Sequence, residues 1–326
     1  MQKLLMGIAG FVTLGIALVQ PAQAAPRQLV VVVAEGVNPQ VMQFGADYSK
    51  SVVGEEDATS ALADLKMQKT MTAEGVTFEA MKGLLKTAAA NGWKTGLVTT
   101  GSAAKDAATL YGVDATGADA AKTLVADTKF NFIAGGGRAD FNADLKKSLT
   151  AAGGTALFDA ESVENGETEL KGKTLILQSD AALSYAIDQN PENEVGLGEL
   201  VSLGTETLAG ENNAPYMLVV HDTNVAKALA AKDTPALAEE LRTLDGIIGD
   251  VISQREDNES LVVAVIATGS NVAPSFATQV AADHSNAFFI LSALPMSFAK
   301  AGTALTGAND EAITTFANDE YKGWKI

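Results

Sequence analysis

The sequence contains no cysteine, only two histidines among 326 residues, and fewer basic than acidic side chains. Without cysteine, the chain gains no disulfides even in an oxidising compartment. Lysine and arginine number 23 against 40 aspartates and glutamates, which gives a formal net charge of −17 at pH 7. Such an acidic surface repels nucleic acid and anionic lipid, so we expect neither as a partner.

Charge is also scarce at the N-terminus, where Lys3 is the only charged residue before Arg27. An apolar run over Leu4–Val19 follows, and Gln20–Ala24 ends in an Ala-x-Ala sequence. A basic start, an apolar segment and a small-residue cleavage site are typical of a secretory signal peptide. We therefore expect residues 1–24 to be removed and the protein to be periplasmic or secreted. The alternative is an uncleaved anchor, for which the apolar run is short.

Long apolar runs are absent from the remaining sequence, where none approaches the roughly 18 residues that a membrane-spanning helix requires. We therefore expect no membrane insertion after signal cleavage. The remaining length is sufficient for one large α/β core or two modest domains. Because no linker or internal repeat divides it, we expect residues 25–326 to form a single α/β domain.

The mature sequence alternates apolar strands with amphipathic helices around Leu29–Val37, LVVVVAEGV. Four consecutive valines, stopped by Glu35-Gly36, predict a central strand buried on both faces. Further strands are predicted at Thr95–Thr100, Phe130–Ile133, Ala156–Phe158, Thr174–Gln178, Tyr216–Val220, Leu261–Ile266 and Phe288–Leu291. Helices are predicted over residues 57–67, 77–90, 102–111, 140–152 and 195–208, and from 234 onward.

This alternation favours a doubly wound, mostly parallel sheet with helices on both faces. In open parallel sheets, ligands bind outside the carboxyl ends of the strands. Glu35 stands at such an end, so it is the first candidate for chemistry.

Four blocks of the sequence together resemble the motifs of one enzyme family over nearly the whole mature chain. Leu183–Gly210 is similar to the family's M-P-Y-E-I-D-R-N-P…S-L-A-E-M-T…A-L segment. Phe132–Phe141 contains the family's G-G-G-R-x-x-F, and Gly96–Tyr111 begins with its G-L-V-T-T. Tyr216–Ser270 resembles the strand, long helix and strand that normally carry most of the metal ligands. The family is that of the alkaline phosphatases, and the resemblance implies an alkaline-phosphatase-like fold and a homodimer.

The resemblance also implies a mechanism with two zinc ions, a magnesium ion and a serine nucleophile. Glu35 stands where the family has a metal-bridging aspartate, so a carboxylate is retained at that position. The nucleophile position falls on Glu55 or Ala58, depending on the anchor of the alignment. Neither side chain is a suitable nucleophile, which leaves the neighbouring hydroxyls of Thr59 and Ser60 as candidates.

Most other ligand positions implied by the resemblance carry side chains that cannot bind a metal. The glutamate, aspartate and histidine ligands fall on Val220, Val225 and Leu229. The family's T-A-D-H motif falls on Ile266–Gly269 and loses both ligands. Because divalent cations require oxygen or nitrogen donors, hydrocarbon at these positions predicts a lost metal centre. The family's dizinc site also uses three histidines, and this chain has two in total.

Three residues remain candidate ligands for Mg, Ca or Zn, namely Glu35, Thr109 and His221. Thr109 matches the magnesium-binding threonine if one residue is inserted, and without the insertion the position falls on Ala107. His221 adjoins the lost glutamate position, and Asp222 follows it. Adjacent residues on a strand point to opposite faces, so His221 and Asp222 cannot easily share one metal.

Other polar segments are open to both a functional and a structural interpretation. They are an acidic cluster of Glu55–Asp57 with Glu35, the T-A-D-H-like Ala282–His284, the glycine-rich Gly135–Arg138, and the hydroxyls of Thr100–Ser102 and Thr268–Ser270. We expect a solvated loop, a solvated helix end, a structural turn and helix caps, respectively. A Ser-His-Asp hydrolase would require G-x-S-x-G or a similar motif, which is absent.

The favoured interpretation is an exported, alkaline-phosphatase-like protein that has lost catalysis and serves as a binding or structural module. No cofactor is assigned unless the site is retained, in which case it would bind a divalent cation (Mg, Ca or Zn), and the partner is an unidentified protein or small molecule. The alternative is a metal-dependent phosphomonoester hydrolase with a rebuilt site that uses Glu35, Thr59 or Ser60, Thr109 and His221.

Overall fold

The computed structural model describes residues 28–37, 39–53, 60–64, 78–166, 168–212, 214–256, 258, 261–268, 275–277 and 288–289. The predicted signal peptide lies outside the described residues. Within these ranges, no helix combines the length and the apolar character needed to cross a membrane.

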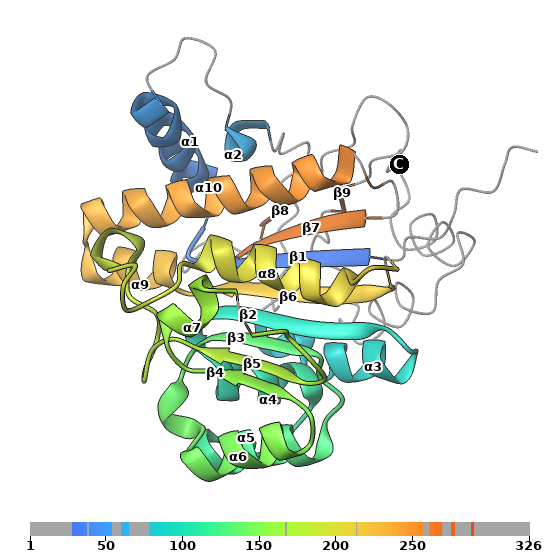
Figure 1. Cartoon of the computed structure of the whole chain (residues 1–326). Helices are drawn as coiled ribbons and strands as arrows, with labels where there is room; N and C mark the ends of the chain where they lie inside the picture. The colour runs from blue at the N-terminus through green and yellow to red at the C-terminus, as the bar shows by residue number, and fades with distance from the viewer. Residues whose placement is uncertain are drawn as a thin grey trace, which may run out of the picture.

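The described strands form one sheet in the order β4-β5-β3-β2-β6-β1-β7-β8, with β9 paired to β7 (Figure 1). The strands are β1 (Gln28–Glu35), β2 (Lys94–Ser102), β3 (Phe132–Gly136), β4 (Thr155–Leu157), β5 (Thr174–Leu177), β6 (Tyr216–Asp222), β7 (Leu261–Thr268), β8 (Ser275–Ala277) and β9 (Phe288–Phe289). All pairings are parallel except that of β8 with β7. The prediction of a mostly parallel α/β sheet is therefore confirmed.

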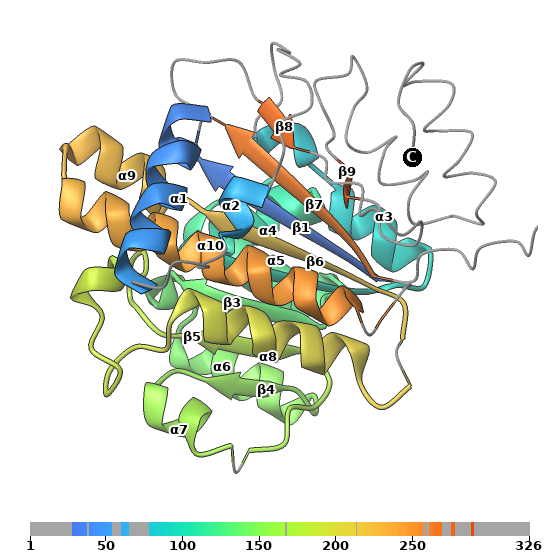
Figure 2. The same ribbon diagram turned by 90° about the horizontal axis from the view of Figure 1, so that it is seen from above.

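Helices cover both faces of the sheet (Figures 1 and 2). The α-helices are α1 (Pro39–Val53), α2 (Ala61–Asp64), α3 (Leu84–Ala90), α4 (Ala103–Tyr111), α5 (Gly117–Asp127), α6 (Ala143–Ala151), α7 (Ala160–Glu164), α8 (Leu197–Ala209), α9 (Asn224–Ala231) and α10 (Thr234–Glu256). Short 3₁₀ helices are η1 (Phe78–Met81), η2 (Arg138–Asp140) and η3 (Ala186–Asp188).

Two adjacent residues of β2 show that α4 and α8 lie on opposite faces. The hydroxyl of Thr95 hydrogen-bonds the hydroxyl of Tyr111 in α4 at 2.7 Å. A Cβ atom on Gly96 would lie 2.8 Å from Leu208 in α8. Because successive strand residues point to opposite faces, the two helices cover the sheet from both sides.

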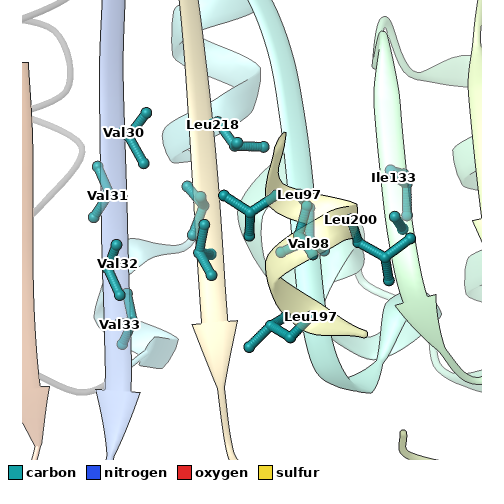
Figure 3. Close-up of a cluster of buried hydrophobic side chains, with 14 of the residues drawn as sticks. Val30, Val31, Val32, Val33, Leu97, Val98, Ile133, Leu197, Leu200 and Leu218 are labelled. Atoms are coloured by element: carbon teal, nitrogen blue, oxygen red, sulfur yellow. The ribbon is translucent and has the colours of Figure 1, made fainter. Parts of the chain in front are cut away.

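The core lies between these helix layers and the central strands. Val30–Val33 of β1 are at most 2% exposed, as expected for a strand covered on both faces. Leu97 and Val98 of β2 lie in the same cluster, and Leu200 of α8 packs over it (Figure 3). Leu241, Leu244, Ile248 and Val251 of α10 are also buried, and α10 contacts both α1 and β7.

Candidate functional site

The carboxyl ends of β1, β2 and β6 lie side by side, because β6 pairs in parallel with both other strands. His221 of β6 lies opposite Val33 of β1 and Thr99 of β2. Glu35 is two positions beyond Val33, so its side chain points to the same face as Val33 and His221. The sheet register therefore brings together Glu35 and His221, two of the residues predicted from the sequence.

His221 is hydrogen-bonded through both ring nitrogens to carboxylates. Its Nδ1 lies 2.8 Å from Oδ2 of Asp106 in α4, and its Nε2 lies 3.1 Å from Oε1 of Glu35. His221 and Asp106 are each 3% exposed, whereas 35% of the Glu35 side chain is accessible to solvent. We call Glu35, Asp106 and His221 the His221 cluster.

Two further side chains fix the geometry of the His221 cluster. The phenyl ring of Phe78 stacks on the imidazole with centroids 3.7 Å apart and an interplanar angle of 1°. The hydroxyl of Thr99 donates a hydrogen bond of 2.6 Å to the same Oδ2 atom of Asp106 that contacts His221. The imidazole is therefore held at its edges by two carboxylates and on one face by a ring.

The carboxylates keep the imidazole protonated despite its burial. Burial by itself disfavours the charged form and lowers the pKa of His221. The hydrogen bonds and charges of Asp106 and Glu35 outweigh this effect and raise the pKa to about 9. At neutral pH the ring is therefore an imidazolium that donates one hydrogen bond from each nitrogen.

This arrangement does not fit the divalent metal centre that the resemblance implies. A ring nitrogen that carries a proton has no lone pair for a metal, and both nitrogens of His221 are used in this way. Val220 and Val225, at two of the implied ligand positions, are buried hydrocarbon. Throughout the described ranges, no group of three or more His, Cys, Asp or Glu side chains is placed to hold a metal ion.

The hydroxyls of the other two described site candidates, Thr109 and Ser60, have hydrogen-bond partners of their own. The hydroxyl of Thr109 donates to the carbonyl of Lys105 one turn earlier in α4. The hydroxyl of Ser60 is buried and hydrogen-bonds Asp245 of α10 at 3.1 Å. Thr59, the second nucleophile candidate, lies outside the described residues, as do the acidic cluster Glu55–Asp57 and the segment Ala282–His284.

The glycine-rich turn and the threonine-serine segment have structural partners. The N–H groups of Gly137 and Arg138 donate to the carbonyls of Ala181 and Ser179, so they are not free to bind an anion. The hydroxyl of Ser102 accepts a hydrogen bond from the N–H of Lys105, which confirms its prediction as the N-cap of α4. The side chains of Thr268–Ser270 lie outside the described part of the chain.

A second pair of acidic residues lies on the other face of β6. Asp222 is 1% exposed, and burial raises its pKa to about 6. Glu240 of α10 is 3% exposed, and burial together with the charge of Asp222 raises its pKa to about 8. Glu240 accepts hydrogen bonds from the N–H of Ala186 and the side-chain amide of Asn224.

Comparison with solved structures finds alkaline phosphatases, whereas no family model and no curated protein matches the sequence. The alkaline phosphatase of Thermus thermophilus superposes with a TM-score of 0.61 and 16% identity, over 76% of this chain and 61% of that chain. The chain has an alkaline-phosphatase-like fold. The alkaline phosphatase of the Antarctic bacterium TAB5 gives a TM-score of 0.55 and 16% identity, over 77% of this chain and 87% of that one. A cold-active enzyme from Shewanella sp. gives 0.57 and 15%, over 74% and 67%.

Because the sequence identities to these enzymes are only 15–16%, the likeness concerns the fold alone. The chain matches 61% of the length of the Thermus thermophilus enzyme. The resemblance inferred from the sequence motifs and the structural likeness agree on the architecture.

Sequence reasoning missed two members of this arrangement, Asp106 and Phe78. Asp106 stands in the first turn of the helix that follows β2, beside Ala107, where the resemblance placed a magnesium ligand. An acidic residue next to an implied ligand position was the available signal. Phe78 lies within the helix predicted over residues 77–90, and nothing in the sequence indicates that it stacks on a histidine.

Proposed function

We propose that this chain is an exported, alkaline-phosphatase-like protein without metal-dependent phosphatase activity, which serves as a binding or structural module. The observation that supports this proposal is the double hydrogen bond of His221 to Glu35 and Asp106. The imidazolium supplies, from within the chain, the positive charge that these two carboxylates would otherwise take from a cation.

The chemistry of phosphoryl transfer explains why this substitution matters. Two metal ions stabilise the attacking and the leaving oxygen, and they need open coordination positions to do so. An imidazolium that is 3% exposed and stacked under Phe78 offers neither a coordination position nor a hydroxide. The hydroxyl of Thr99 donates to Asp106 and accepts a hydrogen bond from the N–H of Gly101, and the residue is fully buried, so the hydroxyl is not accessible to a phosphate ester.

Metal content and hydrolysis test the proposal directly. Mature protein is incubated with zinc and magnesium salts, freed of unbound metal, and assayed for bound zinc and for hydrolysis of an aryl phosphate. We expect no stoichiometric zinc and no hydrolysis above that of a Glu35→Gln variant. Stoichiometric zinc with hydrolysis that is lost on chelation and in Glu35→Gln would instead establish the rebuilt phosphomonoesterase.

A further inference from the structure

Three buried polar residues meet where β6, α9 and α10 come together. Asp222 ends β6, Asn224 begins α9 and Glu240 lies in the second turn of α10. All three are nearly inaccessible, with exposed fractions of 1%, 1% and 3%. This group lies on the opposite face of β6 from the His221 cluster, because adjacent strand residues point to opposite sides.

Both carboxyl groups contact Asn224, which places them close together. The N–H of Asn224 donates to Oδ1 of Asp222 at 2.8 Å. Its side-chain Nδ2 lies 3.3 Å from Oε1 of Glu240 and 3.1 Å from the carbonyl of Ser184. Thr100 also donates to Oδ1 of Asp222 at 3.3 Å. The available donors are thus directed to one oxygen of each carboxyl group.

The remaining oxygens of Asp222 and Asn224 have no partner. Oδ2 of Asp222 and Oδ1 of Asn224 are buried without a hydrogen bond. In the described part of the chain, neither Asp222 nor Glu240 forms an ion pair with lysine or arginine. A buried, unpaired polar atom is costly, and a buried carboxylate without a counter-charge is more so. The charges of His221 and Lys227 act on the two carboxyl groups, but no ion pair of Asp222 or Glu240 is formed within the described ranges, and the unpartnered oxygens could accept a directly bound cation.

The chemistry of these atoms defines the class of that partner. They are oxygens without sulfur or nitrogen among them, which is the donor set that hard cations prefer. Two carboxylates match the charge of a divalent ion. We propose that Asp222, Asn224 and Glu240 bind one hard divalent cation, Mg²⁺ or Ca²⁺, through Asp222 Oδ2, Asn224 Oδ1 and the carboxylate of Glu240. Asn224 contributes an amide oxygen, so only two of the three proposed ligands, Asp222 and Glu240, are acidic.

A cation at this position ties together three consecutive elements of the chain. It links the end of β6, the start of α9 and the long helix α10. A ligand that binds only the folded state stabilises it in proportion to the logarithm of its concentration above the dissociation constant. Binding should therefore raise the thermal midpoint of the protein, and removal of the cation should lower it.

The test is titration of metal-free mature protein with CaCl₂ or MgCl₂ by calorimetry, at constant ionic strength. We expect one equivalent of at least one of the two ions per chain and a rise in the thermal midpoint that NaCl does not reproduce. The isosteric changes Asp222→Asn and Glu240→Gln each should weaken binding at least tenfold.

The matched control is Glu35→Gln, which removes a carboxylate of the His221 cluster and should leave the titration unchanged. Loss of binding in this control, or unchanged binding in both Asp222→Asn and Glu240→Gln, would place the cation elsewhere and overturn the proposal. Absence of binding in the unmodified protein would overturn it as well, and would indicate that the two carboxyls instead retain a proton. Circular dichroism of each variant verifies that it folds, and Asn224→Ala provides a third ligand change should either variant fail to do so. None of these results depends on phosphatase activity.

Discussion

At the residue scale, His221 explains the most about this protein. It was identified from the sequence because histidines are scarce and because it follows a buried strand. Its partner Glu35 could be placed at the same edge, since parallel strands end together. Asp106 and Glu240 could not be predicted, because both lie in helices, and the reach of a helical side chain depends on how the helix docks.

The raised pKa of His221 makes a pH-dependent contribution to stability. The folded-state pKa of about 9 lies above the ordinary value of 6.5. The contribution is therefore fully present below pH 6.5 and is lost as the pH rises through about 9. The difference between the two pKa values corresponds to about 3 kcal/mol.

Denaturant unfolding of the native protein and of His221→Gln measures this contribution. We expect the native protein to be more stable than the variant near pH 6 and the difference to shrink as the pH is raised to 10. Comparison with the variant removes the effects of other titrating groups, including Asp222 and Glu240. A difference that is constant over this range would contradict a buried imidazolium.

At the scale of elements, all described strands except the short β8 were predicted, whereas several helices were not. Continuous apolar runs such as Val30–Val33 identify buried strands without further information. By contrast, α1, α5 and α9 were not predicted. Each buries few bulky side chains, such as Met42 in α1, Leu124 in α5 and Val225 in α9, among small residues such as Ala46 and Ala120, so the apolar stripe is weak in the sequence.

The turn after β1 depends on a close approach between elements. Gly36 has φ +83°, and a Cβ atom there would lie 2.7 Å from Cα of Ala226 in α9. Gly92 has the same φ, but a Cβ atom there would meet nothing within 4 Å. Gly36→Ala should therefore cost more than Gly92→Ala, whose left-handed conformation alone costs roughly 1–2 kcal/mol.

Urea unfolding of Gly36→Ala and Gly92→Ala isolates the contact between β1 and α9. The two variants share the conformational penalty, so the difference between their free energies of unfolding reports the steric term. Equal losses in the two variants would show that α9 can move away from the turn without cost.

At the scale of the whole molecule, the fold was predictable, whereas the role stays a prediction. Strand-helix alternation indicated the architecture, and the motif resemblance indicated an alkaline-phosphatase-like fold, with which the solved structures agree. Function could be argued only from the residues that stand at the metal-ligand positions implied by the resemblance. Burial, orientation and hydrogen bonding of side chains from distant segments decide such a site, and these emerge only when the chain folds.

Export remains a prediction from the first 24 residues. The full chain, produced in a bacterium with its own N-terminus, should yield a mature form that begins at Ala25. Mass spectrometry of periplasmic and culture-medium fractions measures this directly, with a deletion of Leu4–Val19 as the control that should remain in the cytoplasm. Intact protein retained in the inner membrane would favour the uncleaved anchor.

The stacking of Phe78 on His221 gives the imidazole a distinctive magnetic environment. The ring current of a phenyl group 3.7 Å above the imidazole shields its carbon-bound protons, which should therefore resonate upfield of an exposed histidine. The two nitrogen-bound protons, each engaged by a carboxylate, should exchange slowly enough with solvent to be observed as separate downfield signals. Phe78→Leu should abolish the upfield shift while leaving both downfield signals in place. The protonation state on which catalysis or its loss depends can thus be read from a single ring by NMR.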